Sequence, residues 1–210
     1  MPHLVLLGDS VFDNIAYVQG GLDVVAQLSA VLPPGWHASL SAVDGSIASD
    51  IEHQLIALHA DTTHLVLSVG GNNALSVASV LDSPVESTAE AFRLLADIRE
   101  RFEEEYAYAV DACLRFGRPL TVCTIYNGNF PDADFNRRAR IALAIFNDVI
   151  VRVALARRLD VIDLRAVCTM PTDFANPIEP SAMGGEKIAQ TVARVVLKET
   201  AWRGMRMTGW

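Results

Sequence analysis

The chain has 210 residues, of which 51% are hydrophobic and 20% are charged, and its formal net charge is -8. This composition excludes a disordered or low-complexity protein, and the acidic balance argues against nucleic-acid binding as the main function. No apolar run approaches the roughly 20 residues that cross a bilayer, and the amino terminus has no signal-peptide pattern. Three widely spaced cysteines, Cys113, Cys123 and Cys168, are typical of free thiols in a reducing compartment, so a cytoplasmic location is expected.

Five short runs rich in aliphatic residues alternate along the chain with segments of helical period. The first and third runs are continuously apolar rather than alternating, as in Leu4-Val5-Leu6-Leu7. Continuous apolarity is typical of strands that are buried on both faces of a parallel sheet. The predicted strands are His3–Leu7, His37–Val43, His64–Val69, Leu120–Tyr126 and Val161–Leu164.

The segments between these strands predict helices. Ile51, Leu55 and Leu58 share one face of a helix that begins near residue 47. A long apolar stripe follows Ser83-Pro84-Val85-Glu86, which predicts a capped helix start with proline at the first helical position. Gly117 ends that helix. Two more helices are predicted at about residues 136–158 and 185–198.

Strands that alternate with helices predict an α/β fold with three layers, an α/β/α sandwich. We expect a flavodoxin-like, doubly wound sheet of five parallel strands. No repeat and no flexible linker interrupts the pattern. The chain is therefore interpreted as one domain over residues 1–200, followed by a tail over residues 201–210 that contains two tryptophans.

A small, polar, glycine-containing segment directly follows each of the first four predicted strands. In a doubly wound sheet the ligand site lies at the carboxyl ends of the strands. We therefore expect these segments to converge on one rim. They are Gly8-Asp9-Ser10, Asp44-Gly45-Ser46, Gly70-Gly71-Asn72-Asn73 and Asn127-Gly128-Asn129.

Three residues of this rim suit acyl-transfer chemistry. Ser10 follows the first strand at the predicted start of a helix, where helix-terminal N–H groups favour a nucleophile whose attack generates an oxyanion. The Gly45 backbone N–H and the Asn72 side chain can donate hydrogen bonds to the same oxyanion. Each residue also has an ordinary interpretation, as a helix cap, a turn glycine and a loop asparagine. Their order along the chain, each after a strand, favours the chemical interpretation.

In these motifs the chain resembles the SGNH hydrolases, also called GDSL esterases and lipases, over about residues 3–197. Gly8-Asp9-Ser10 resembles the nucleophile motif, Gly45 matches the glycine of the second motif, and Gly70-Gly71-Asn72-Asn73 resembles Gly-x-Asn-Asp. Ile178-Glu179-Pro180-Ser181 resembles the last motif, Asp-x-x-His-Pro. The resemblance implies hydrolysis of carboxylic esters without a metal or cofactor. It implies Ser10 as the nucleophile and Ser10, Gly45 and Asn72 as the oxyanion hole.

The chain departs from the family pattern at three positions. Asn73 replaces an aspartate of the third motif that has no catalytic role. Glu179 stands where the family has its catalytic histidine, and Asn176 stands where it has the aspartate that orients this histidine. The motifs therefore support the nucleophile and the oxyanion hole but leave the general base to be found.

The histidines are poorly placed to act as that base. His3, His37 and His64 begin predicted strands, which puts them at the opposite end of the sheet, roughly 16 Å from Ser10. His59 lies at the far end of the helix after the second strand. His53 lies on the same helix, which runs away from the rim, and is the least unfavourable of the five.

Glu179 is the remaining candidate. A carboxylate can accept the serine proton, although its reference pKa of about 4.3 makes it a weaker base than imidazole at about 6.5. Burial raises the pKa of a carboxyl, and a second carboxylate raises it further; Asp173 is a possible neighbour. The alternative is a structural Glu179 that caps a helix or holds Ser10 without turnover. Asn176 is taken with Ser10 and Glu179 as the candidate catalytic set.

Two functions follow. The first is a serine hydrolase of a small-molecule carboxylic ester that uses Ser10 and Glu179. The second is a binding protein on the same fold that recognises an acyl, acetylated or sugar-like ligand. A nucleotide-binding or response-regulator domain ranks last, because the chain has no phosphate loop and no acidic pair for Mg²⁺ after the first strand. The oligomeric state stays open.

Other polar residues of the rim are candidates for substrate binding. We expect Asn127, Asn129 and Asp132 to line the pocket wall or else to satisfy their own loop. Phe130 and Phe135 either form an apolar lip or belong to the core. The predicted substrate-binding residues are Asp9, Asn73, Asn127 and Asn129.

Overall fold

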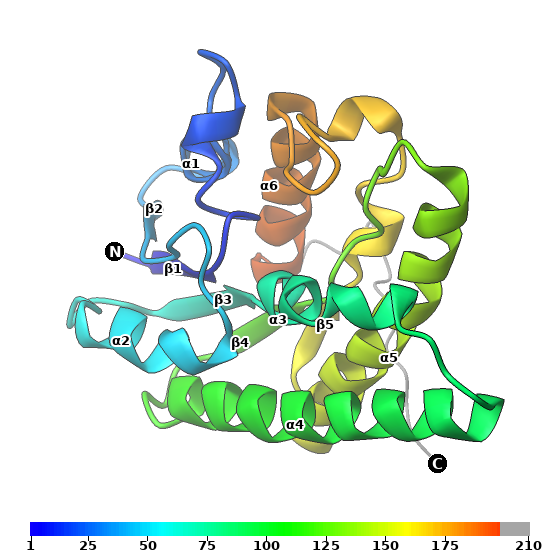
Figure 1. The fold of residues 1–210 in the computed structure, drawn as a ribbon. Helices are drawn as coiled ribbons and strands as arrows, with labels where there is room; N and C mark the ends of the chain where they lie inside the picture. Colours follow the sequence, from blue (N-terminus) through cyan, green and yellow to red (C-terminus); the bar gives the residue numbers. More distant parts are fainter. Residues whose placement is uncertain (198–210) are drawn as a thin grey trace.

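The computed structural model describes residues 1–197, and at their centre lies a five-stranded sheet in which all strands are parallel (Figure 1). The strand order is β2-β1-β3-β4-β5, the flavodoxin-like arrangement, so the predicted fold class is confirmed. The strands are β1 His3–Gly8, β2 His37–Leu40, β3 His64–Ser68, β4 Leu120–Cys123 and β5 Asp160–Ile162.

Four strands end before the residues predicted for them; β3 ends one residue early, at Ser68, and the other three end two or three residues early. β2 ends at Leu40 because the next two residues both donate their N–H groups to the Leu6 carbonyl, which turns the chain out of the ladder. β4 ends at Cys123, and the backbone of Ile125 is bound on both sides by the Asn147 side chain instead of by a strand. β5 ends at Ile162, two residues before the predicted Leu164.

Helices cover both faces of this sheet (Figure 1). α1 and α6 pack against each other on one face, and α2, α4 and α5 cover the other. The α-helices are α1 Val24–Val31, α2 Ile51–Ile56, α3 Gly71–Ser76, α4 Thr88–Leu114, α5 Ala133–Ala156 and α6 Ala182–Val196. Short 3-10 helices are η1 Ile15–Tyr17, η2 Ala48–Asp50, η3 Ala78–Asp82, η4 Leu164–Ala166 and η5 Pro171–Asp173.

The continuous apolarity of β1 reflects burial on both faces. Val5 and Leu7 belong to the core under α2, α4 and α5, whereas Leu4 and Leu6 belong to the core under α1 and α6. None of the four is more than 1% exposed. Because successive strand side chains point to opposite faces, a strand between two helical layers needs an apolar residue at every position.

Two predicted helix starts were wrong. Ser10 does not begin a helix: it lies in a single turn in which Asp9 accepts from the N–H groups of Phe12 and Asp13, and the first helix begins at Val24. The long helix begins at Thr88, capped by the Ser87 hydroxyl. The predicted cap at residue 83 instead follows η3, so the true cap comes four residues later.

The three cysteines are buried and form no disulfide, as expected. Within residues 1–197 no helix has the length and apolarity needed to cross a membrane. The predicted last helix ends at Val196, and its expected end at residue 198 and the tail over residues 201–210 lie outside the described residues.

Candidate active site

A cavity of about 100 Å³ opens at the carboxyl ends of β1, β3 and β4. Its polar end is formed by Asp9, Ser10, Asn72 and Glu179. Its walls come from α3, η3, α4 and α5 and are almost entirely apolar. They include Ala74, Leu75, Val77, Val80, Leu81, Leu95, Ile98, Phe130, Phe135, Ala139, Leu143 and Phe146. Four polar groups at the end of a long apolar wall suit an amphiphilic ligand.

Ser10 reaches this cavity because β1 ends in an unusual backbone conformation. Gly8 has φ +131°, and a Cβ at this position would lie 1.7 Å from the Ser68 carbonyl oxygen of β3. The tight approach turns the chain sharply, and Ser10 follows it at the rim with 7% of its surface exposed. The Ser10 backbone N–H makes no hydrogen bond within residues 1–197 and is therefore available to an oxyanion.

Gln54 of α2 holds the same turn, and the sequence reasoning missed it. Its side-chain carbonyl accepts from the Gly8 N–H at 2.8 Å, and its amide donates to the Gly8 carbonyl at 2.7 Å and to the Ser46 hydroxyl at 3.1 Å. A buried glutamine next to the apolar Ile51 and Leu55 was the available signal, since a buried amide needs fixed partners.

Glu179 is held against Ser10 by a loop between η5 and α6. The Asn176 side chain accepts from the N–H groups of Ile178 and Glu179, both at 2.9 Å. The Glu179 carbonyl accepts from the Ala175 N–H at 2.9 Å. Asn176 thus fixes the backbone that carries Glu179 and does not contact its carboxylate, unlike the role implied by the family motif.

A second residue that the sequence reasoning missed joins this loop to the turn that carries Ser10. Asn14 is fully buried, and its amide donates to the Pro180 carbonyl at 3.3 Å while its carbonyl accepts from the Val24 N–H at 3.0 Å. Asn14 is four residues from Ser10, and Pro180 follows Glu179. Its fixed hydrogen bonds therefore bring together two segments that are about 170 residues apart in the chain.

Glu179 is only 6% exposed, and its surroundings raise the pKa of its carboxyl. Burial raises the pKa of Glu179 and the Asp44 carboxylate raises it further, while hydrogen bonding with the Ser10 hydroxyl lowers it. Oε2 of Glu179 has no hydrogen-bond partner among the described residues. The carboxyl is therefore next to the Ser10 hydroxyl, and its Oε2 is free to accept a proton or a hydrogen bond.

Asp173 does not act on Glu179 as expected. It is fully buried, and its carboxylate accepts from Lys187 Nζ at 2.6 Å and from the N–H groups of Thr169 and Met170. Burial alone would raise the pKa of Asp173, but Lys187 and the two N–H groups lower it overall. Asp173 anchors the start of α6, where its carbonyl accepts from the Ser181 N–H.

Asp9, the residue before Ser10, has a buried carboxyl and lines the cavity. Burial raises its pKa to about 7, and the Glu179 carboxylate contributes to the rise, although the Val11 N–H donates to Asp9 at 3.1 Å. Near neutral pH the Asp9 carboxyl is therefore partly protonated, whereas an exposed aspartate is ionised.

We expect Asp9→Asn to stabilise the protein at alkaline pH by about 2 kcal/mol. The unfolded chain releases the Asp9 proton near its ordinary pKa of about 4, whereas the folded chain keeps it to about pH 7. Stability is therefore lost as pH rises between these values, and the variant escapes this loss. Urea unfolding at pH 4 and pH 8, with exposed Asp160→Asn as the control, measures it; an equal gain at both pH values would contradict the assignment.

The two predicted side donors of the oxyanion hole differ in placement. Asn72 lines the cavity, and its amide donates to the Ser46 carbonyl at 3.0 Å, which leaves its second N–H free to donate. Gly45 has φ +83°, is exposed and lies outside the cavity lining, although its N–H makes no hydrogen bond within the described chain. The geometry therefore supports Asn72 more directly than Gly45 as a donor to an oxyanion at Ser10.

Three predicted substrate-binding residues do not line the cavity. The Asn73 side chain accepts from the Ala48 N–H at 3.0 Å and donates to Glu105 at 2.9 Å, so it joins α3 to η2 and α4. The Asn129 N–H donates to the Pro177 carbonyl at 2.8 Å. Neither they nor Asn127 is among the lining residues.

Two aromatic residues that follow the fourth rim segment, Phe130 and the α5 residue Phe135, do line it. The rings of Phe130 and Phe135 meet edge to face with centroids 4.9 Å apart. Both rings belong to the apolar lining of the cavity, which agrees with the expected apolar lip.

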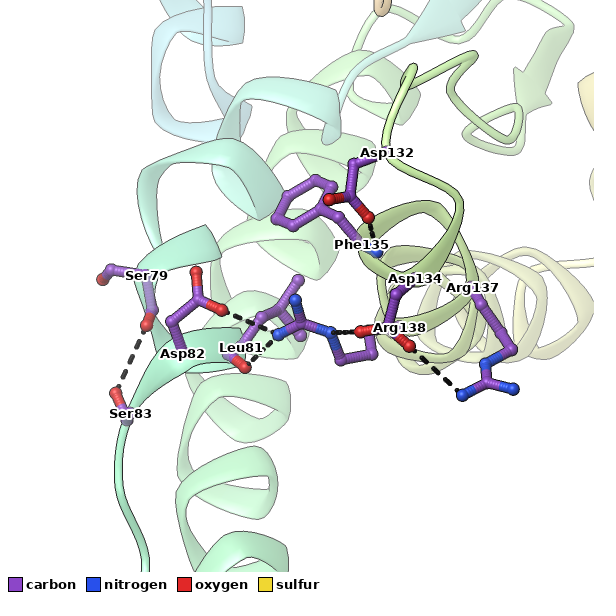
Figure 2. A network of polar contacts seen from close by, with 9 residues as sticks. All are labelled: Ser79, Leu81, Asp82, Ser83, Asp132, Asp134, Phe135, Arg137 and Arg138. Carbon is purple, nitrogen blue, oxygen red and sulfur yellow. Dashed lines mark hydrogen bonds and ion pairs between the residues drawn. The ribbon is translucent and has the colours of Figure 1, made fainter.

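Arg138 of α5 links this helix to η3, and both elements line the cavity. Figure 2 shows its guanidinium reaching from α5 to η3, where it donates to the Leu81 carbonyl at 2.6 Å and to Asp82 at 2.7 Å. Its Nε donates to Asp134 of α5 at 3.0 Å, and Asp132 caps the helix. Arg138 thus holds η3 and α5 together on the outer side of the apolar walls.

The histidines lie where the strand positions predicted. His3 and His37 stack with ring centroids 3.9 Å apart at the starts of β1 and β2, and His59 lies 6.0 Å from His3. His53 is exposed on α2. None of the five lines the cavity. His3, His37 and Asp61 offer three possible ligand atoms within 4.8 Å of one another, but both nitrogens of His3 already have partners, Asp61 and Ser39.

The fold is shared with G-D-S-L lipolytic proteins. An extracellular lipase from Streptomyces rimosus superposes with a TM-score of 0.65 over 92% of this chain and 100% of its own, at 16% identity. A lipolytic G-D-S-L protein from Veillonella parvula gives 0.68 over 94% and 100%, at 15% identity. A lipase from a goat rumen metagenome gives 0.71 over 91% and 96%, at 15% identity. No family model and no curated protein matches the sequence.

Proposed function

We propose that the chain is an SGNH-type serine hydrolase of carboxylic esters, with Ser10 as nucleophile and Glu179 as general base. The observation that carries the proposal is the buried Glu179 carboxyl beside the Ser10 hydroxyl at the polar end of an apolar cavity. The shared fold with lipases supports it. We extend the proposal to residues 1–200 as one catalytic domain and, from the three free thiols, to a cytoplasmic location.

The proposed reaction has two halves. Glu179 accepts the Ser10 proton as Oγ attacks the ester carbonyl carbon, and the resulting oxyanion accepts from the Ser10 N–H and the Asn72 amide, with Gly45 as an outer donor. Glu179 then returns the proton to the leaving alcohol, which gives an acyl-serine. In the second half Glu179 accepts a proton from water as the water attacks the acyl carbon. The bond from the acyl carbon to Ser10 Oγ then breaks, Glu179 returns the proton to Oγ, and the carboxylic acid departs.

The raised pKa of Glu179 makes this role chemically reasonable. A carboxylate of ordinary pKa is a weak base toward a serine hydroxyl, and every increase in its pKa strengthens its pull on the proton. Burial supplies the increase here, with Asp44 adding to it. The buried, partner-free Oε2 means that no structural hydrogen bond competes for that oxygen.

The apolar walls supply a place for the acyl chain, so acyl length is the direct test. We expect wild type to hydrolyse p-nitrophenyl esters, with kcat/KM rising about tenfold or more from acetate to octanoate because each buried methylene contributes about 0.8 kcal/mol. Ser10→Ala removes this activity. Turnover that survives Ser10→Ala, or no turnover of any ester, contradicts the proposal.

The second candidate, a binding protein that recognises an acyl ligand, is favoured by one observation, the loss of the histidine base. Reaction of Ser10 with a fluorophosphonate separates the two candidates, because it requires an activated nucleophile and no particular ester. Covalent labelling of Ser10 found by mass spectrometry supports the hydrolase. Binding of a fatty acid without labelling supports the binding protein.

Asn176→Ala is expected to lower kcat about tenfold with little change in KM, because it frees the backbone that positions Glu179. Asn176→Asp keeps an oxygen that accepts both N–H groups and should retain most of the activity. Ester hydrolysis and thermal unfolding of both variants measure this. If the alanine variant keeps full kcat, Asn176 does not position Glu179.

A further inference from the structure

Two histidines and an aspartate gather at the amino end of the sheet, outside the site described above. They come from the starts of β1 and β2 and from the loop before β3, three strands that lie side by side. His3 Nδ1 lies 3.0 Å from Asp61 Oδ1, and His37 Nε2 lies 3.7 Å from Asp61 Oδ2. Two ring nitrogens therefore face one carboxylate. These three residues are called the amino-end cluster.

The spacing within the amino-end cluster suits a metal ion. Its three possible ligand atoms all lie within 4.8 Å of one another. A tetrahedral Zn²⁺ with bonds of about 2.0–2.1 Å holds its ligand atoms roughly 3.3 Å apart. The distances of 3.0 and 3.7 Å to the Asp61 oxygens lie on either side of this value, so small side-chain rotations are enough to admit the ion. The ion takes the place of the proton between His3 and Asp61.

The second nitrogen of His3 already has the partner that a metal-binding histidine needs. His3 Nε2 lies 2.7 Å from the Ser39 hydroxyl oxygen. A hydroxyl can accept as well as donate, so Ser39 can accept from Nε2–H when Nδ1 binds the ion. Such an outer hydrogen bond orients the imidazole of a metal ligand and strengthens its binding. The two partners of His3 are therefore compatible with a bound ion.

The amino-end cluster is open to solvent on one side. The His3 side chain is only 4% exposed, but those of His37 and Asp61 are 42% and 60% exposed. An ion can enter from that side, and water can complete its coordination as the fourth ligand. Two imidazoles and one carboxylate favour Zn²⁺ over Mg²⁺, which prefers oxygen ligands.

We propose that the amino-end cluster is a structural site for a divalent metal ion of the zinc type. The ion would join three neighbouring strands through residues that are far apart in the chain, at positions 3, 37 and 61. Because the unfolded chain does not bring these residues together, binding stabilises the folded state. Ser10 follows the opposite end of β1, so the ion takes no part in the proposed hydrolysis and the inference does not depend on that function.

Calorimetry with zinc chloride on the full chain without a histidine tag tests the site. We expect one zinc ion to bind per chain and magnesium chloride to give no binding. The unfolding temperature should rise by about 5–10 °C when free zinc is a hundred times its Kd. Absence of zinc binding overturns the inference.

Three variants locate the ion. His37→Ala removes a half-exposed ligand and should lower zinc affinity about tenfold or more, and Ser39→Ala should lower it about tenfold by removing the outer partner of His3. His53→Ala removes an exposed histidine of α2 and should leave zinc affinity unchanged. Thermal unfolding in EDTA shows whether each variant is folded. Equal zinc affinity in wild type and folded His37→Ala overturns the assignment of the ion to this cluster.

Discussion

Glu179→Gln is expected to lower kcat for ester hydrolysis by about 10²–10⁴-fold, the usual contribution of a general base. Glutamine has the shape of glutamate but cannot accept the Ser10 proton. Because it also relieves the charge that burial opposes, the free energy of unfolding should stay equal or rise. The measurement is hydrolysis of p-nitrophenyl octanoate together with thermal unfolding of the same sample.

Two controls complete this prediction. Ser10→Ala should be at least as impaired as Glu179→Gln, and the double variant should be no worse than Ser10→Ala alone, because the two side chains act as a unit. A Glu179→Gln enzyme with wild-type kcat would show that Glu179 is a structural carboxyl. The base would then have to be found elsewhere among the residues of the cavity.

Gly8→Ala is expected to destabilise the fold by about 3–5 kcal/mol, one of the largest effects of a single substitution in this chain. The new Cβ would lie 1.7 Å from the Ser68 carbonyl oxygen. Gly8 and Ser68 are paired residues of two neighbouring interior strands, so neither backbone can move aside. The φ of +131° adds strain for any residue other than glycine. Urea unfolding measures the loss, and the nucleophile turn should be displaced with it.

Gly35→Ala is the matched control. Gly35 also has a positive φ, +88°, but a Cβ there meets nothing within 4 Å. It should therefore lose only about 1 kcal/mol, the cost of the left-handed backbone. If the two alanine variants lost similar stability, the contact with Ser68 would not be what constrains the end of β1.

The fold followed from the sequence because its main signal is local. Continuous apolarity in β1 and β3 predicted helices on both faces of the sheet. Polar, glycine-containing segments directly after strands predicted a site at the carboxyl ends of the strands. The ends of strands were less predictable where a side chain distant in sequence takes the place of the neighbouring strand as hydrogen-bond partner, as Asn147 does after β4. The start of a helix likewise depends on competing caps. Ser83 and Ser87 are each followed by a glutamate three residues later, but only Ser87 caps the helix.

The sequence predicted that the proposed reacting groups lie together, but it did not predict the side chains that hold them in place. Ser10, Asn72 and Glu179 meet at one cavity, as motif order suggested. Gln54 and Asn14 could not be assigned to the site from sequence, because each acts through hydrogen bonds to backbone groups far away in the chain. The position of Gln54 beside apolar residues of its helix hints at burial, but the partners of a buried amide are visible only after the fold is known.

The electrostatic neighbours of Glu179 show the same limit. Asp173, six residues away, was the expected partner but is neutralised by Lys187, whereas Asp44, 135 residues away, supplies the charge. The apolar lining of the cavity could not be predicted either, because the positions of residues such as Phe130 and Leu81 depend on how η3 and α5 pack. Sequence proximity predicts charge coupling poorly once loops fold over one another.

The pH dependence of Ser10 labelling by a fluorophosphonate tests most directly whether Glu179 activates Ser10. The account predicts that the labelling rate of wild type rises with pH through a pKa above the usual range of glutamate, because the ionised carboxylate is the base and burial raises its pKa. In Glu179→Gln this rise should disappear and the rate should fall by about 10²-fold or more. Labelling of Ser10 at the same rate and with the same pH profile in both proteins would contradict it.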